Sequence, residues 1–194
     1  MSQYFCSIVD NALRNPAQRM YFDLGEYRYG LTVVGDGEPI VCFHGFSESS
    51  YTWDSINLTG YRLIRIDLIG HGDSDIPEED EAYTIPKMIE DLHTVIYHMV
   101  GDRYYLMGYS MGARIALSYA LQYDSEIEGL ILESGSVGIA SEAERAERRK
   151  ADEELAHHIE HNDGSWFASR WAEAPIFESQ KQLLPAVAEL IYLR

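Results

Sequence analysis

A serine between two glycines is the residue of this sequence best placed to do chemistry. Gly108-Tyr109-Ser110-Met111-Gly112 follows a strand-like run at 103–107 and precedes a helix-like run. Glycines at these positions permit a sharp strand-to-helix turn, a nucleophile elbow, which lifts the serine hydroxyl clear of a sheet. The hydroxyl then needs a histidine base, an orienting carboxylate and oxyanion donors. Ser110 is therefore the predicted catalytic residue, and the sequence supplies its partners only in part.

Two backbone N–H groups are the predicted oxyanion donors. His44-Gly45-Phe46 directly follows the apolar run 39–43, where a loop could contribute the N–H of Phe46. Met111 contributes the second N–H because it follows the nucleophile. Loss of one such donor costs other enzymes roughly 3 kcal/mol of barrier. We interpret the His44 side chain as shaping its loop through bonds to backbone groups.

A second loop carries an acid and a histidine in the wrong order. Asp67 and His71 lie in the glycine-rich stretch 67–74, after the strand-like run 62–66. In proteins with a nucleophile elbow, the acid and then the histidine follow the serine along the chain. We therefore interpret this loop as structural, with direct proton transfer by Asp67 or His71 as the alternative.

The elements that must position these motifs alternate along the chain. Strand-like runs occupy 39–43, 62–66, 103–107 and 129–133, and helical periodicity covers 85–100 and 111–122. Residues 20–34 predict two antiparallel strands broken near Gly25, and the first twenty residues predict a short helix or a loose arm. This alternation predicts an α/β protein with a mostly parallel sheet.

After Ser136 the pattern becomes helical. Ser141 and Glu144 form a capping box, the charged segment to His161 contains no strand, and Gly164 and Pro175 punctuate short helices through Leu193. We predict two domains, a core at 1–137 and a helical lid at 138–194 over the carboxyl edge of the sheet.

The three loop motifs, each after a predicted strand, resemble the α/β-hydrolase superfamily over residues 20–137. The elbow 109–114, the segments 133–138 and 145–152, and the residues Phe167, Trp171, 175–177 and 179–180 narrow this resemblance. They are similar to the 2-succinyl-6-hydroxy-2,4-cyclohexadiene-1-carboxylate synthases of menaquinone biosynthesis. That resemblance implies a lyase that expels pyruvate from a succinyl-bearing cyclohexene carboxylate, with a serine and a histidine base, and no cofactor is expected.

A multiply anionic substrate requires fixed guanidinium groups, because arginine's planar fork suits carboxylates. Arg114 lies one helical turn after Ser110, so it is a predicted substrate-binding residue, with a structural salt bridge as the alternative. The resemblance adds Arg148, Trp171 and Arg194. Tyr109, the variable residue of the elbow, is a pocket wall or a packing residue.

Each of these residues also has a structural interpretation. Trp171 could belong to the core, and Arg194, as the last residue, is expected to fray. Arg145, Arg149 and Lys150 share a helix segment with many carboxylates and are interpreted as solvated i,i+4 pairs.

Charge and cysteine content limit the partners. A formal net charge of -17 over 194 residues disfavours nucleic acid and anionic membranes. The small anionic substrate that the resemblance implies would need a local cluster of arginines. Cys6 and Cys42 give no disulfide framework, and no leader or apolar span is found, so a cytoplasmic protein is expected. His157 and His161 have i,i+4 spacing without a third ligand, so no metal is expected. The sequence specifies no oligomeric state.

The superfamily places its acid and catalytic histidine after the lid, beyond Arg194. We therefore expect the 194 residues to be an inactive part of a longer, active enzyme, with the strand at 130–132 left uncovered. A genuinely short inactive relative is the alternative to this. Two other functions remain open: a serine hydrolase acting on esters or carbon-carbon bonds, and a non-catalytic binding protein.

Overall fold

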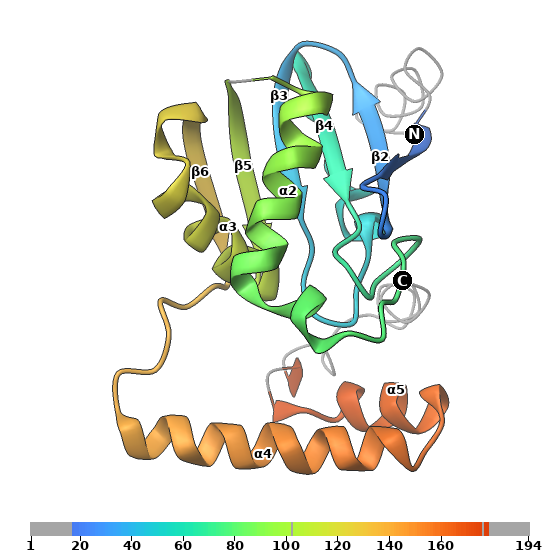
Figure 1. Cartoon of the computed structure of the whole chain (residues 1–194), viewed down its shortest axis with the longest axis vertical. Helices are drawn as coiled ribbons and strands as arrows, with labels where there is room; N and C mark the ends of the chain where they lie inside the picture. Colours follow the sequence, from blue (N-terminus) through green and yellow to red (C-terminus); the bar gives the residue numbers. More distant parts are fainter. Residues whose placement is uncertain (1–16, 102, 176, 179–194) are drawn as a thin grey trace, which may run out of the picture. The chain divides into compact units, whose positions relative to one another are not determined.

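The computed structural model describes residues 17–101, 103–175 and 177–178 (Figure 1). The chain divides into two compact units, 1–137 and 138–194. The first unit is built on a six-stranded sheet of order β1-β2-β4-β3-β5-β6. Its strands are β1 (Gln18–Asp23), β2 (Arg28–Gly35), β3 (Glu38–Phe43), β4 (Tyr61–Ile66), β5 (Tyr104–Tyr109) and β6 (Ile127–Glu133).

The predicted α/β class is confirmed. Strands β3, β4, β5 and β6 run parallel, whereas β1 and β2 form an antiparallel pair that joins the sheet through β4. The antiparallel pair broken near Gly25 is thus present. The expectation that the first twenty residues form a short helix or a loose arm is corrected at its end. Strand β1 begins at Gln18, so residues 18–20 already pair with β2. Residues 1–16 lie outside the described residues.

The sheet is buried unequally on its two faces. Val41 and Phe43 of β3 point into a large cluster, and the alternating Ile40 and Cys42 point into a smaller one around Trp53. Helices α2 (Ile85–Met99) and α3 (Met111–Gln122) pack into the large cluster, and Figure 1 shows both against the sheet. The short 3-10 helices are η1 (Ser50–Trp53), η2 (Asp80–Tyr83) and η3 (Asp124–Glu126).

The helical periodicity predicted over 85–100 and 111–122 is confirmed by α2 and α3. The buried residues of α2 are Met88, Ile89, Asp91, Leu92, Val95 and Ile96, and those of α3 are Gly112, Ala113, Ile115, Ala116 and Tyr119. Leu117 and Ala120, on the flanks of the buried face of α3, are half-buried. Both helices therefore bury one amphipathic face, as their periodicity predicts.

The second unit contains α4 (Glu142–Glu160) and α5 (Gly164–Ala172). The Ser141 hydroxyl accepts a hydrogen bond from the Glu144 N–H at 3.4 Å, which confirms the predicted start of α4. Asp163 accepts from the Trp166 N–H at 2.9 Å and begins α5. The predicted role of this unit as a lid stays a prediction, and the predicted helices after residue 178 lie outside the described residues. None of the described helices combines the length and the apolar content that crossing a bilayer requires.

Strand β6 forms one edge of the sheet and pairs with β5 alone among the described strands. Leu130, Ile131 and Leu132 are 36%, 46% and 42% exposed. The predicted uncovered strand is therefore observed in the described part of the chain.

Candidate active site

Ser110 occupies the turn between β5 and α3, as the elbow motif predicts. Its backbone has φ 52° and ψ -109°, which a residue with a side chain rarely adopts. The Ser110 N–H donates to the Glu133 carbonyl at 2.9 Å, so the end of β6 fixes this turn. Backbone strain of this kind collects at active sites, where the surrounding structure imposes it.

The two glycines of the elbow are required by close approach of backbone atoms. A Cβ on Gly112 would lie 2.2 Å from the Phe43 carbonyl oxygen and 2.5 Å from that of His44. A Cβ on Gly108 would lie 2.4 Å from the Gly112 carbonyl oxygen. The start of α3 therefore packs directly on the ends of β3 and β5, which is possible only without side chains at Gly112 and Gly108.

The loop after β3 lies beside the elbow. A Cβ on Gly45 would come within 3.0 Å of the Tyr109 ring, so the two segments touch. Phe46 is 41% exposed in this loop, and Met111 is the first residue of α3, where the helix offers its N–H no acceptor. Both predicted oxyanion donors thus belong to neighbouring segments at the carboxyl edge of the sheet, and their catalytic role stays a prediction.

His44 links two loops through its buried imidazole. Its Nε2 accepts from the Leu68 N–H at 2.9 Å, so Nδ1 carries the proton and donates to the Gly45 carbonyl at 2.7 Å. Burial lowers the pKa of His44 to about 4. The neutral ring therefore ties the loop after β3 to the loop after β4, which agrees with its interpretation as a loop-shaping residue.

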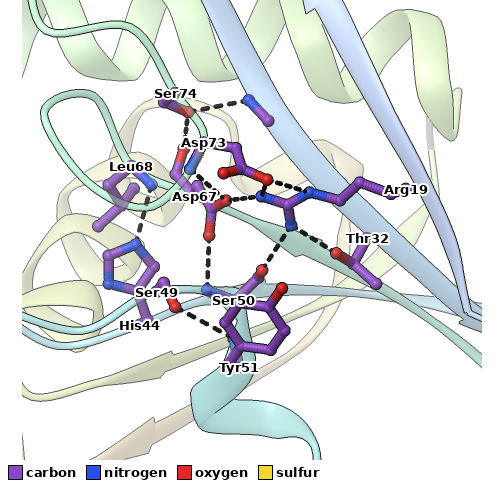
Figure 2. Close-up of polar contacts among 11 residues, drawn as sticks. Arg19, Thr32, His44, Ser49, Ser50, Tyr51, Asp67, Leu68, Asp73 and Ser74 are labelled. Atoms are coloured by element: carbon purple, nitrogen blue, oxygen red, sulfur yellow. Dashed lines mark hydrogen bonds and ion pairs between the residues drawn. The ribbon is translucent and has the colours of Figure 1, made fainter. Parts of the chain in front are cut away.

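Asp67 is the centre of a buried polar network (Figure 2). Its carboxylate accepts from the Ser50 N–H at 2.6 Å and the Asp73 N–H at 3.0 Å, and it forms an ion pair with Arg19. Burial acts to raise the pKa of Asp67, but these backbone hydrogen bonds and the Arg19 guanidinium outweigh it and hold the pKa below its usual value. The carboxylate is thus engaged in holding loops together.

His71 is likewise held by structure rather than by the serine. Its Nδ1 lies 3.1 Å from the Ile69 carbonyl, and its ring centroid lies 5.2 Å from that of His44. No histidine of the described residues hydrogen-bonds to the Ser110 hydroxyl. These contacts support the structural interpretation of the Asp67 loop.

Two polar residues at this edge were missed by the sequence reasoning. The Arg19 guanidinium also donates to Thr32 Oγ1 at 2.6 Å and Ser50 Oγ at 2.8 Å, so β1 is linked to β2 and to the start of η1. Glu48 accepts from the Gly45 N–H at 3.1 Å and stabilises the turn that carries Phe46. Glu48 could have been found as a turn acceptor three residues after Gly45, whereas no local motif marks Arg19.

Arg114 and Tyr109 lie in the same unit as Ser110. Arg114 is exposed in the first turn of α3, and its N–H donates to the Ser110 carbonyl at 3.3 Å. Its guanidinium forms no ion pair within the described ranges, so the alternative of a structural salt bridge finds no support there. Tyr109 is half-buried, and burial together with the Glu48 and Glu133 carboxylates raises its pKa.

Arg148 and Trp171 lie in the helical unit. The Arg148 Nε donates to both carboxylate oxygens of Asp152, at 2.8 and 2.9 Å, and both side chains are exposed. Trp171 stacks on Phe167 with ring centroids 5.7 Å apart and meets Phe177 edge-on. Substrate binding by these two residues stays a prediction, and Arg194 lies outside the described residues.

The interpretation of the other cations of α4 is partly corrected. Lys150 lies 3.8 Å from Glu154, the predicted i,i+4 pair. Arg145 instead donates to the Ile139 and Ala140 carbonyls, at 2.8 and 2.7 Å, because these groups precede the helix and lack partners within it.

The chain is similar to a known fold family and to named proteins of two bacteria. Residues 38–188 match the family model described as the alpha/beta hydrolase fold. A Bacillus subtilis (strain 168) protein, provisionally named 2-succinyl-6-hydroxy-2,4-cyclohexadiene-1-carboxylate synthase, is 36% identical over 160 residues, 80% of this chain and 58% of its own length. The Salmonella typhimurium (strain LT2) protein of that name is 33% identical over 159 residues, 78% of this chain and 62% of its own length.

The chain therefore spans about three fifths of the length of these relatives. Among solved structures, the thioesterase domain from the curacin biosynthetic pathway has a TM-score of 0.67 and 22% identity. That match covers 92% of this chain and 67% of the domain, and it supports the fold alone.

Proposed function

The chain belongs to the alpha/beta hydrolase fold family, and from this premise we propose that the complete protein is a lyase of menaquinone biosynthesis that eliminates pyruvate from a succinyl-bearing cyclohexene carboxylate. Similarity to the synthases named above supports the reaction class. The observation that carries the proposal is Arg114, an exposed residue one turn from Ser110 whose guanidinium has no ion-pair partner among the described residues. In a chain of net charge -17, such a cation suits an anionic ligand.

Ser110 would act in proton transfer. A histidine of the complete protein would deprotonate the hydroxyl, because the described histidines make no hydrogen bond to it. The serine would then take a carbon-bound proton of the substrate, and the electrons of that C–H bond would form a new carbon-carbon double bond as the carbon-oxygen bond to the leaving group breaks. The leaving group would depart as an enolate, take up the proton and tautomerise to pyruvate. The N–H groups of Phe46 and Met111 would stabilise the negative charge that develops on the substrate oxygen.

The remaining predicted residues would bind the anionic substrate. Arg114 and Tyr109 would contact it from the elbow, and Arg148, Trp171 and Arg194 would contact it from the helical unit acting as a lid. Exchange of its exposed pair with Asp152 for a substrate carboxylate would cost Arg148 little, because solvated ion pairs contribute less than about 1 kcal/mol.

The test measures pyruvate release by the complete protein. Ser110→Ala should abolish it, since the proton-transferring hydroxyl is gone, and unchanged release would refute the mechanism. Arg114→Ala and Arg148→Ala should chiefly raise KM. Arg103→Ala is the matched control for Arg114, because Arg103 precedes β5 at the opposite end of the strand and pairs with Glu128.

The same variants separate the other two functions. A serine hydrolase would turn over a simple aryl ester, and Arg148→Ala would scarcely change that rate. A binding protein would keep its ligand affinity in Ser110→Ala and show no turnover in any form. The lyase requires pyruvate release that depends on Ser110 together with weaker binding in the arginine variants.

A further inference from the structure

Three side chains that can bind metals meet at the C-terminal turn of α4. His157, Glu160 and His161 are exposed, and each offers one ligand atom such that all of these atoms lie within 4.8 Å of one another. We propose that they bind one divalent ion of the zinc, nickel, copper or cobalt class. Positions i, i+3 and i+4 share one face of a helix, which explains why neighbouring turns bring them together.

This site revises the sequence expectation of no metal. That expectation rested on two histidines without a third ligand, whereas the helix places the Glu160 carboxylate beside both. The imidazole rings of His157 and His161 have centroids 4.3 Å apart. Three protein ligands leave the remaining coordination positions to water, as in open zinc sites.

The orientation of His161 favours metal binding. Its Nδ1 lies 2.7 Å from the His157 carbonyl oxygen, which can only accept, so Nδ1 carries the proton and Nε2 holds a free lone pair. Metal-binding histidines usually donate their other ring N–H to a carbonyl or carboxylate in this way. The helix backbone therefore fixes the tautomer that a metal requires.

The local field favours a cation at the same place. Unpaired carbonyl groups give the C-terminal end of a helix partial negative charge. Glu153 and Glu154 lie one turn before His157 and add negative charge. Lys150 offsets only part of it, through its exposed pair with Glu154 at 3.8 Å. Imidazole with a single carboxylate suits zinc-like ions better than Mg²⁺ or Ca²⁺, which prefer sites made of oxygen ligands.

A bound ion would join residues of consecutive turns. It would therefore hold the last turn of α4, immediately before Asp163 caps α5. The proposal is independent of the lyase activity, because no residue of the elbow takes part.

The test titrates the full chain with Zn²⁺ against a chromophoric chelator and with Co²⁺ by visible absorption. We expect one saturable equivalent that excess Ca²⁺ does not displace. His157→Ala and His161→Ala should each lower the affinity at least about tenfold, since loss of outer-shell partners alone has effects of that size. Glu160→Gln should lower it less. His158→Ala is the matched control, because that ring contacts Trp166, at 5.6 Å between centroids.

Binding that persists in the His157→Ala/His161→Ala double variant would overturn the proposal, as would an equal loss in His158→Ala. The substituted side chains are exposed, so the variants should fold, and far-UV circular dichroism checks this. Hydrogen exchange gives a second measurement: Zn²⁺ should slow exchange at 157–161 in the unsubstituted chain and leave it unchanged in the double variant.

Discussion

The α/β unit and the helical unit keep their charged residues in place by different means. Asp67 is fully buried and is held by groups from β1, from the start of η1 and from its own loop. Arg148 in α4 pairs with Asp152 one turn away, and α4 contains no buried residue. Contacts between distant elements position the Ser110 edge, whereas local helical spacing positions the side chains of α4. The same substitution should therefore have very different effects in the two units.

Glycine replacements should give the largest contrast. Gly112→Ala places a Cβ 2.2 Å from a backbone oxygen that cannot move independently of the sheet, so we expect a loss of about 5 kcal/mol or more. Gly164→Ala in the first turn of α5 meets nothing within 4 Å and should stabilise by roughly 0.5–1 kcal/mol. Urea denaturation measures both. A well-folded Gly112→Ala variant would show that α3 does not press on β3.

Carboxylate removal should give the next largest contrast. Asp67→Ala leaves the Ser50 and Asp73 N–H groups without their acceptor, while Arg19 keeps its ion pair with Asp73, so we expect a loss of about 2–4 kcal/mol. Asp152→Ala breaks an exposed pair on α4 and should cost less than about 1 kcal/mol. Denaturation of the two variants under the same conditions provides the comparison. Equal losses would mean that the Asp67 network contributes no more than a surface pair.

Acidification should destabilise the α/β unit through His44. Its pKa is about 4 in the folded chain and about 6.5 when unfolded, so below pH 6.5 the unfolded chain binds a proton that the folded chain excludes. The contribution of the neutral His44 ring to the free energy of unfolding is fully present above pH 6.5, and about 3 kcal/mol of it is lost as the pH decreases towards 4. Asp67, whose pKa is lowered, adds a loss of the same sign as the pH falls below its unfolded value.

Urea midpoints measured between pH 4.5 and 7.5 check this dependence. His44→Asn should weaken the dependence of the urea midpoint on pH, whatever its effect on stability at neutral pH. His158→Ala on exposed α4 should leave that dependence unchanged. A slope that survives in His44→Asn would assign the proton to another group.

Local sequence patterns were sufficient to predict the strands, the helices and the elbow. The runs before His44, Asp67 and Ser110 became β3, β4 and β5, because β-branched and apolar residues between turn signals are typical of buried strands. The capping box at Ser141 marked the start of α4 to the residue.

Contacts that depend on the order of the strands in the sheet could not be predicted from the sequence. Arg19 and Asp67 are separated by 48 positions and meet because β2 lies between β1 and β4. Burial of the Tyr119 hydroxyl is tolerated because it hydrogen-bonds to the Tyr104 hydroxyl at 2.7 Å. Helical periodicity does not reveal such a partner on another element. The elbow motif predicts its glycines as turn residues, yet Gly112 is needed because its backbone packs on the end of β3, almost seventy residues earlier.

The strained backbone of Ser110 has an evolutionary consequence. Glycine would adopt φ 52° with less strain, and such conformations cost other residues of order 1–3 kcal/mol. Ser110→Gly should therefore yield a more stable chain that lacks the hydroxyl. Mutation under pressure for stability alone would favour glycine at this position. The serine of this chain therefore stands at the expense of stability, which is what the proposed role of its hydroxyl predicts.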